Sequence, residues 1–354
     1  MTPLKSVFYS TDVFNKCCIA WLFCGDETMD FLTDPFLVDK TSIDGPVLVT
    51  GAGGCIGSWT LAILSRSGIP CVAFDLSDDR RRPSLVMDPR SVARLTWEIG
   101  DIANGDALKV LVERYNIRSI IHLAGLQVPF CKASPAAGAR VNVEGTINIL
   151  EVARHAGIKR TVYASSVAAL GMPPGGPYLA TLYGAYKLAN EYTAQVYWQD
   201  WEIPSIGIRP NIVYGIARDQ GMTSKCTVAM HAAVVGQSYK IPYSGLTSWL
   251  YAGEAAAAFI AAISRDGEGA YKFNLNGACE TVEAGVDIVC KLIPNAIVSI
   301  VGSPLPFPPD LDDAQIRNHV GNYPSISVAD GIADTCRAFQ ILNEAGRLDA
   351  PPSF

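Results

Sequence analysis

The most constraining feature of this sequence is an apolar strand that runs into a glycine-rich turn, Val-Leu-Val-Thr-Gly-Ala-Gly-Gly-Cys-Ile-Gly at residues 47–57. An apolar segment of helical character, residues 58–64, follows directly. A strand, a tight turn and a helix N-terminus in this order direct unpaired backbone N–H groups and the positive end of the helix dipole toward one point. The pattern therefore predicts a pyrophosphate-binding turn in an α/β fold.

The spacing of the glycines predicts how a dinucleotide is held. Gly51 permits the tight turn, Gly54 lets the backbone approach the pyrophosphate, and Gly57 lets the helix pack on the strand. Cys55 and Ile56 lie between the second and third of these glycines and belong to the predicted cofactor site.

A second apolar strand, residues 70–75, ends in Asp75, which lies 24 positions after Gly51. A carboxylate near this offset meets the adenosine ribose and repels the additional phosphate of NADP. An aspartate that merely starts a loop is the alternative. An arginine of the run Arg80–Arg82 can serve NADP, although such runs are usually solvated. The sequence predicts NAD as the cofactor.

Bulk properties restrict the class of protein. The chain has 354 residues, is 49% hydrophobic and carries a formal net charge of -6, which argues against a nucleic-acid surface. No apolar run approaches the ~18 residues that a membrane span requires. The ten cysteines form no CxxC pair, and neither they nor the four histidines show the spacing of a metal site. Reduced thiols in the cytoplasm are the expectation.

Residues 1–44 stand apart from the rest as an N-terminal extension of unknown role. Lys16 and the apolar residues after it faintly resemble a secretion signal. The apolar core is short, however, and Gly25, Asp26 and Glu27 follow where a small-residue cleavage site is expected. We therefore expect an appended or irregular segment.

Strand-like and helix-like segments alternate from Pro46 to about Pro210. The expected strands are 46–50, 70–75, 94–99, 118–123, 160–165 and 205–209, and the expected helices are 56–67, 104–115, 136–157 and 183–201. This alternation predicts a Rossmann-type doubly wound parallel sheet over residues 45–210, an NAD-binding domain in which ligands bind at the carboxyl ends of the strands.

The regular alternation of strand-like and helix-like segments ends after Pro210. Expected elements are a glycine-containing loop (215–221), helices at 225–236, 251–264 and 281–293, a strand at 270–275, and Pro/Gly-rich stretches at 242–248 and 303–309. Residues 211–354 are therefore predicted to form a smaller mixed α/β C-terminal lobe that binds the substrate.

Tyr183 and Lys187 open the helical segment 183–201, and Tyr183 is the only one of 14 tyrosines with a lysine four positions later. Residues four apart share one face of a helix. The lysine charge, together with that of an oxidised nicotinamide, favours the phenolate and is expected to lower the tyrosine pKa toward neutrality. A phenolate can take a proton from an alcohol while a hydride leaves the same carbon. An amphipathic helix with a snorkelling lysine is the alternative.

Ser165 and Ser166 follow the strand 160–165 at the predicted carboxyl edge of the sheet. A hydroxyl there can hydrogen-bond a substrate oxygen and orient it toward Tyr183. Paired serines also commonly cap a turn.

Taken together, these motifs resemble the extended short-chain dehydrogenase/reductase family, also described as the NAD-dependent epimerase/dehydratase family. The resemblance rests on the glycine turn, Asp75, Gly100-Asp101-Ile102, His122-Leu-Ala-Gly125, Asn142-Val-Glu-Gly-Thr146, Ser165-Ser166, Tyr183-x-x-x-Lys187 and Arg209-Pro-x-x-Val-Tyr-Gly215, and covers residues 46–345.

The resemblance implies roles for further residues. Asp101 and Ile102 would contact the adenine, and Leu123, Ala124, Gly125 and Gln127 would reach the centre of the cofactor, with Gln127 also near the substrate. Asn142, Ser166, Tyr183 and Lys187 would form the catalytic tetrad, in which Lys187 also holds the nicotinamide ribose.

Departures from the family pattern narrow the reaction. Val167 and Ala168 stand where family dehydratases carry an Asp-Glu pair and where decarboxylating relatives keep the glutamate, so neither elimination nor decarboxylation is expected. Ile212 stands where an asparagine usually binds a nucleotide-sugar, which weakens that substrate class.

The predicted substrate site includes Gln127, Ser165, Ser166, Asn211, Arg218 and Thr223. Asn211 comes one residue before the usual asparagine position, and Arg218, Gln220 and Thr223 can hold hydroxyls or a carboxylate, unless they form a solvated loop.

The sequence thus predicts an NAD-dependent oxidoreductase that acts on a secondary alcohol of a sugar-like small molecule. An epimerase that retains its NAD is the first alternative, because the same tetrad serves both reactions. A non-catalytic NAD-binding regulator is the second. By analogy with relatives, we expect a homodimer through the helices near 136–157 and 183–201.

Overall fold

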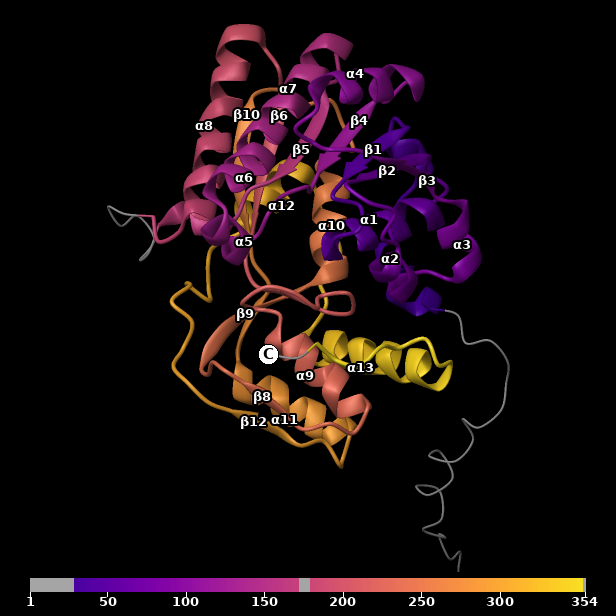
Figure 1. The fold of residues 1–354 in the computed structure, drawn as a ribbon, viewed down its shortest axis with the longest axis vertical. Coiled ribbons are helices and arrows are strands. Elements are labelled where there is room, and N and C mark those ends of the chain that lie inside the picture. Colours follow the sequence, from indigo (N-terminus) through magenta and orange to yellow (C-terminus); the bar gives the residue numbers. More distant parts are fainter. Residues whose placement is uncertain (1–28, 172–178, 353–354) are drawn as a thin grey trace, which may run out of the picture.

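A computed structural model describes residues 29–171 and 179–352 of the chain (Figure 1). The described residues form a parallel sheet of seven strands in the order β10-β6-β5-β4-β1-β2-β3. Its strands are β1 (Val47–Thr50), β2 (Cys71–Asp75), β3 (Thr96–Ile99), β4 (Ser119–His122), β5 (Arg160–Ala164), β6 (Ser205–Pro210) and β10 (Ala270–Leu275). The strand order reverses between β1 and β4, and this confirms the predicted doubly wound α/β sheet.

Helices cover both faces of the sheet. Strand β1 shows how, because Val47 and Val49 join the core on one face while Leu48 joins the core on the other. The first face is covered by α1 (Cys55–Arg66) and α10 (Ala252–Ala261), and the second by α4 (Gly105–Arg114), α7 (Gly145–Ala156) and α8 (Leu182–Trp201).

The helix predicted at 136–157 is divided into three pieces. It consists of α6 (Pro135–Ala139), a π-helical turn (Arg140–Glu144) and α7. A π turn places an extra residue in the helix, often at a functional site. Here the turn carries Asn142, so the break falls on a residue of the predicted tetrad.

Short helices between the strands were not predicted. These are α2 (Arg81–Val86), α3 (Pro89–Arg94) and α5 (Val128–Ala133). Each is six residues long, too short for a periodic apolar pattern to distinguish it from a loop.

The C-terminal lobe lies beyond the carboxyl edge of the sheet (Figure 1). Its strands are β7 (Val213–Tyr214), β8 (Tyr239–Ile241), β9 (Leu246–Tyr251), β11 (Ala278–Thr281) and β12 (Val298–Ile300), and its helices include α9 (Lys225–Val234), α11 (Val282–Leu292) and α13 (Val328–Glu344). The chain also returns to the large sheet, where β10 pairs with β6 and α12 (Ala314–Val320) lies near β10. Residues after 210 therefore contribute to both parts.

Part of the segment predicted as an extension packs into the core. Met29, Leu32 and Phe36 are buried, and the Phe36 ring contacts Trp59 of α1 and Tyr251 of β9. This segment therefore joins α1 to the C-terminal lobe. Residues 1–28, which include Cys17, Cys18 and Cys24, lie outside the described residues.

The cysteines within the described ranges, Cys55, Cys71, Cys131, Cys226, Cys279, Cys290 and Cys336, are all free thiols. Among the described helices, none combines the length and apolar character needed to span a bilayer.

Candidate active site

The glycine turn closes tightly against the end of β4. Gly51 has φ +69°, and a Cβ there would lie 2.6 Å from the backbone nitrogen of Ala124. A Cβ on Gly57 would lie 2.3 Å from the carbonyl oxygen of Gly51. Since α1 begins at Cys55 directly above this turn, its free N–H groups face the cavity. The arrangement fits a dinucleotide pyrophosphate.

Asp75 is held beside the glycine turn. Its Oδ2 accepts a hydrogen bond from the Gly53 N–H at 2.8 Å, and its Oδ1 accepts one from the Leu76 N–H at 2.7 Å. Each arginine of the following run is paired with an acid: Arg80 with Asp78, Arg81 with Asp79 and Arg82 with Asp219. A carboxylate facing the cavity beside paired arginines fits the predicted preference for NAD.

One cavity of about 640 Å³ contains nearly all of the predicted site residues. Those that line it are Gly51, Gly54, Cys55, Ile56, Gly57, Asp75, Asp101, Ile102, Leu123, Ala124, Gly125, Gln127, Ser165, Ser166, Tyr183, Lys187, Asn211, Arg218 and Thr223. The cavity has two ends. Its cofactor end lies at the glycine turn and the ends of β2 and β3, and its substrate end lies at Tyr183, Asn211 and the loop 218–223.

Asn142 is placed behind the cavity rather than in its wall. Its side chain is fully buried, and its Nδ2 donates to the carbonyl oxygens of Leu126 and Gly138 at 3.1 and 3.0 Å. Its Oδ1 has no partner among the described residues and lies 2.8 Å from where a Cβ on Gly125 would stand. Asn142 therefore supports the backbone that lines the cavity at Gly125 and Leu126.

Helix α8 positions Tyr183 and Lys187 together. Thr181 caps the helix by accepting a hydrogen bond from the Gly184 N–H at 3.0 Å. Lys187 Nζ donates to the carbonyl oxygen of Ala164, at the end of β5, at 2.6 Å and lies 5.6 Å from the centroid of the Tyr183 ring. The lysine thus fixes the helix to the carboxyl edge of the sheet.

The pKa values of this pair are set mainly by burial. Burial raises the pKa of Tyr183, while a hydrogen bond with Ser166 and the charge of Arg218 oppose that rise. Burial also lowers the pKa of Lys187 from 10.5 to about 8. Among the protein's own residues burial therefore has the largest effect on the tyrosine pKa, and its lowering by Lys187 together with an oxidised nicotinamide stays a prediction.

The two serines face different partners. Ser166 Oγ accepts a hydrogen bond from the Ala168 N–H at 3.2 Å and also hydrogen-bonds the Tyr183 phenol. Ser165 Oγ donates to Glu191, which is paired with Arg209. Ser166 is thus directed at the tyrosine, whereas Ser165 is tied to a buried ion pair at the edge of the cavity.

Several lining residues were missing from the predicted site. Phe130 and Met222 are exposed apolar side chains in the wall, and Pro306 and Phe307 line the cavity from the proline-rich segment near the C-terminus. An apolar residue in a loop carries no sequence signal of its own. The proline-rich composition of residues 303–309 was visible, but not its position against the sheet edge.

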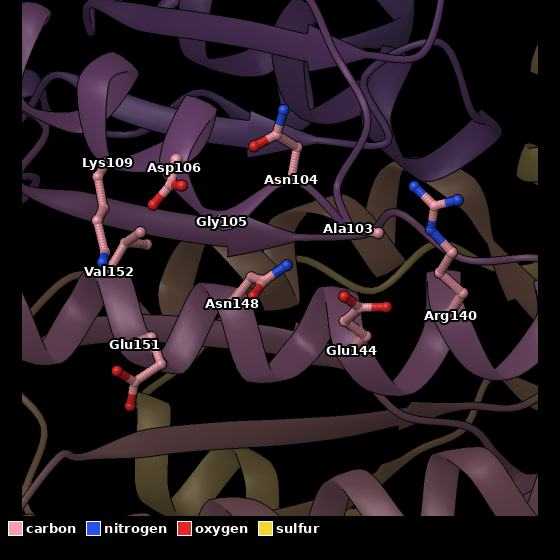
Figure 2. A pocket seen from close by; sticks show the side chains of 10 residues that line it. All are labelled: Ala103, Asn104, Gly105, Asp106, Lys109, Arg140, Glu144, Asn148, Glu151 and Val152. Atoms are coloured by element: carbon pink, nitrogen blue, oxygen red, sulfur yellow. The ribbon is translucent and has the colours of Figure 1, made fainter.

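A smaller hollow of about 460 Å³ lies outside this site, between α4 and α7 (Figure 2). Both acidic and basic side chains line it. Asp106, Glu144 and Glu151 are acidic, and Lys109 and Arg140 are basic. Arg140 pairs with Asp101 at 2.7 Å, and Arg154 pairs with Glu151 at 2.8 Å. Because these charged side chains are already paired and partly exposed, we interpret the hollow as a solvated surface depression.

Known proteins match this chain over most of its length. Residues 47–275 match the family described as the NAD dependent epimerase/dehydratase family. A UDP-glucose 4-epimerase of Mycolicibacterium smegmatis is 29% identical over 316 residues, which cover 83% of this chain and 98% of that protein.

Solved structures of two activities share the fold. A UDP-glucose 4-epimerase of Thermotoga maritima, solved with UDP-glucose, has a TM-score of 0.72 at 18% identity and covers 84% of this chain and 99% of its own. An L-threonine dehydrogenase of Clostridium difficile also has a TM-score of 0.72, at 21% identity, and covers 85% of this chain and 98% of its own.

Proposed function

Because this chain belongs to the NAD dependent epimerase/dehydratase family and is an NAD-dependent enzyme, we propose that it is an oxidoreductase acting on a secondary alcohol of a sugar-like or other polar small molecule. One observation carries this proposal. Tyr183, Ser166 and the glycine turn, which are widely separated in the sequence, line a single cavity.

The chain's own residues have distinct roles in this proposal. NAD, when bound, would supply the hydride acceptor for oxidation of the carbinol carbon and the hydride donor for its reduction. Ser166 holds the substrate oxygen, and the Tyr183 oxygen takes the hydroxyl proton during oxidation and gives it back during reduction. Lys187 fixes α8 to β5 through the Ala164 carbonyl oxygen, which keeps the tyrosine in position.

Gly51, Gly57 and Asp75 are the residues that would hold the cofactor. The two glycines leave no room for a side chain, so that backbone N–H groups at the start of α1 can meet the pyrophosphate. Asp75, which accepts a hydrogen bond from the Gly53 N–H, would accept hydrogen bonds from the adenosine ribose.

An epimerase that retains its NAD is the second candidate. The named activity of the Mycolicibacterium smegmatis relative favours it, since that protein is a UDP-glucose 4-epimerase. The residues of the substrate end favour the dehydrogenase, because Ile212 lines the wall where an asparagine would hold a nucleotide-sugar.

Measuring whether the cofactor is consumed or retained distinguishes the two candidate functions. The protein is purified, its bound nicotinamide is released and quantified, and a panel of sugars, uronic acids, hydroxy amino acids and UDP-sugars is assayed for NADH formation. The proposal expects NADH to accumulate in proportion to added NAD. Substrate interconversion by cofactor that co-purifies and never accumulates as NADH would instead establish the epimerase.

We also propose a homodimer through α7 and α8. Its support is the exposure of apolar side chains on α8, where Tyr192, Val196 and Trp201 are 57%, 46% and 47% exposed. Sedimentation equilibrium measures the mass in solution.

A further inference from the structure

We infer that the substrate carries a carboxylate, and that Arg218 is the specificity-determining residue that binds it. This inference rests on the proposed function, since it concerns the substrate end of the same cavity. It narrows the proposed substrate class from a polar alcohol to a hydroxy acid.

Arg218 lies in the cavity wall, next to a residue with a strained backbone conformation. Arg218 follows Ala217, a non-glycine residue with φ +73°, in the loop after β7. Such a conformation costs energy and persists where the surrounding structure requires it, often at binding sites. The guanidinium lies near enough to Tyr183 for its charge to lower the pKa of the phenol.

The Arg218 guanidinium has an N–H donor without a hydrogen-bond partner among the described residues. Arg218 Nη2 donates to Thr223 Oγ1 at 3.2 Å, while its Nε is buried without a hydrogen-bond partner among the described residues. The neighbouring carboxylate, Asp219, is paired with Arg82 at 2.7 Å. A guanidinium in a cavity wall without a carboxylate partner is best compensated by an anionic ligand, which it can bind in a bidentate manner.

Gly221 lets a second polar group reach the same place. A Cβ on Gly221 would lie 2.5 Å from Gln127 Oε1 and 3.3 Å from Arg218 Nη2. Its φ of +97° also favours glycine. The Gln127 amide and the Arg218 guanidinium therefore flank one glycine, at a point where both can contact one ligand.

The charges lining the cavity favour a single negative group on the substrate. In the described lining, the carboxylates are Asp75, Asp79 and Asp101, which all belong to the cofactor end. The cations of the substrate end are Lys187, bound to the Ala164 carbonyl oxygen, and Arg218. One available guanidinium matches one carboxylate better than the diphosphate of a nucleotide-sugar, which spreads more charge over several oxygens.

The experiment uses the full chain loaded with NAD in the Tyr183→Phe background, so that binding is measured without turnover. Calorimetry compares ligands that differ in one group: galacturonate with galactose, glucuronate with glucose, and L-threonine with L-threoninol. UDP serves as the diphosphate probe. Each is titrated into the parent, Arg218→Met and Arg218→Lys proteins, with Arg94→Met as the control at an exposed arginine.

We expect at least one carboxylate to bind more tightly than its neutral counterpart. Arg218→Met should weaken that binding about 10- to 100-fold, as the loss of charged hydrogen bonds does. Arg218→Lys should weaken it about tenfold, because it keeps the charge but loses the planar fork. Arg94→Met should leave it unchanged.

Three results overturn the inference. They are equal binding of charged and neutral partners across the panel, binding of UDP with no carboxylate bound, and loss of NAD affinity in Arg218→Met with carboxylate affinity unchanged. The last would assign Arg218 to the cofactor phosphates. Any of these leaves the proposed oxidoreductase standing, since NADH formation by the unmutated protein tests that separately.

Discussion

The two ends of the cavity are built in different ways. The cofactor end is made by backbone, where glycines exclude side chains and N–H groups at the start of α1 face the ligand. The substrate end is made by side chains from distant loops, such as Gln127, Arg218 and Phe307. Recognition of the cofactor is therefore fixed by local conformation, whereas recognition of the substrate depends on how the C-terminal lobe packs over the sheet.

The ends also differ in charge. Carboxylates gather where ribose hydroxyls need acceptors, and the guanidinium of Arg218, which has no carboxylate partner among the described residues, lies where the substrate is expected. Tyr183 and Lys187 lie at the junction of the two ends. A change at the junction should abolish the chemistry, and changes further out should affect one ligand and leave the other.

Tyr183→Phe tests the junction and should have the largest effect. Removing the hydroxyl removes the proton acceptor but keeps the ring, so kcat should fall about 10³-fold, as for loss of general acid–base catalysis. NAD affinity should stay within about twofold, because the cofactor end is untouched. Steady-state kinetics and NAD titration measure these two quantities.

Tyr271→Phe is the matched control, because that side chain on β10 is 43% exposed, lies outside the cavity lining and keeps its ring. It should retain full activity. Equal activities of Tyr183→Phe and the unmutated enzyme would remove Tyr183 from the chemistry.

Burial of Lys187 at the junction lowers the free energy of unfolding at pH values where this lysine must carry its charge. Its pKa is about 8 when folded and 10.5 ordinarily, so between these values the unfolded chain holds a proton that the folded chain lacks. Stability therefore rises with pH through this window, by ~3 kcal/mol for the lysine alone. Lys187→Met should lose this rise, so its unfolding free energy relative to the unmutated protein should decrease as pH increases from about 8 to 10.5.

Urea unfolding of both cofactor-free proteins at several pH values measures the difference between their unfolding free energies. The buried tyrosines and cysteines titrate in both proteins, so their contributions cancel in this difference. Lys132→Met changes an exposed lysine instead and should run parallel to the unmutated protein. A parallel curve for Lys187→Met would show that Lys187 is charged at no cost.

The cofactor end was predictable because its signals are local. The glycine spacing, the apolar strands and the acid at the end of β2 lie within 30 residues, and each follows from backbone geometry. Strands β1, β2, β5 and β6 were predicted to within a residue or two of their observed bounds. Tyr183 was found for the same reason, since a spacing of four on one helix needs no tertiary information.

The rest depends on contacts between distant segments. Nothing near Phe307 or Phe36 in the sequence shows that one would reach the substrate end and the other would pack on Trp59. The π turn at Asn142 is a local break within a helical segment, which the apolar periodicity of the sequence does not report. The burial that raises the Tyr183 pKa is likewise a property of the whole fold, which a spacing of four along one helix does not report.

Asp75→Asn probes the cofactor end with a smaller expected effect. The amide oxygen can still accept from the Gly53 N–H, so the turn should remain while the charge is lost. NAD affinity should fall about tenfold, and the preference for NAD over NADP should narrow, because the repulsion of the extra phosphate disappears. Fluorescence titrations with NADH and NADPH measure both, with Asp78→Asn as the control. An unchanged preference would assign the selectivity to another group.

The smallest expected effect concerns an ion pair that links the two ends of the cavity. Arg82 Nε contacts Asp219 Oδ1 at 2.7 Å, and Arg82 Nη1 donates to the carbonyl oxygen of Gly53 at 3.0 Å. Because Asp219 belongs to the substrate loop and Gly53 to the glycine turn, this pair holds the loop against the cofactor end. Because the two side chains keep 14% and 28% of their surface exposed, solvent still screens the pair, and Asp219→Asn should speed NADH release only about 2- to 5-fold.

Stopped-flow displacement of bound NADH measures this rate, and its response to salt identifies an ionic contribution. A slower release in Asp219→Asn would mean that Asp219 competes with the cofactor phosphates for Arg82, and the pair would then weaken cofactor binding rather than retain it. A faster release confined to low salt would show that the two ends are coupled through charge. A dehydrogenase needs such a link to be weak, since its cofactor must leave in every cycle, whereas an epimerase that retains its NAD does not.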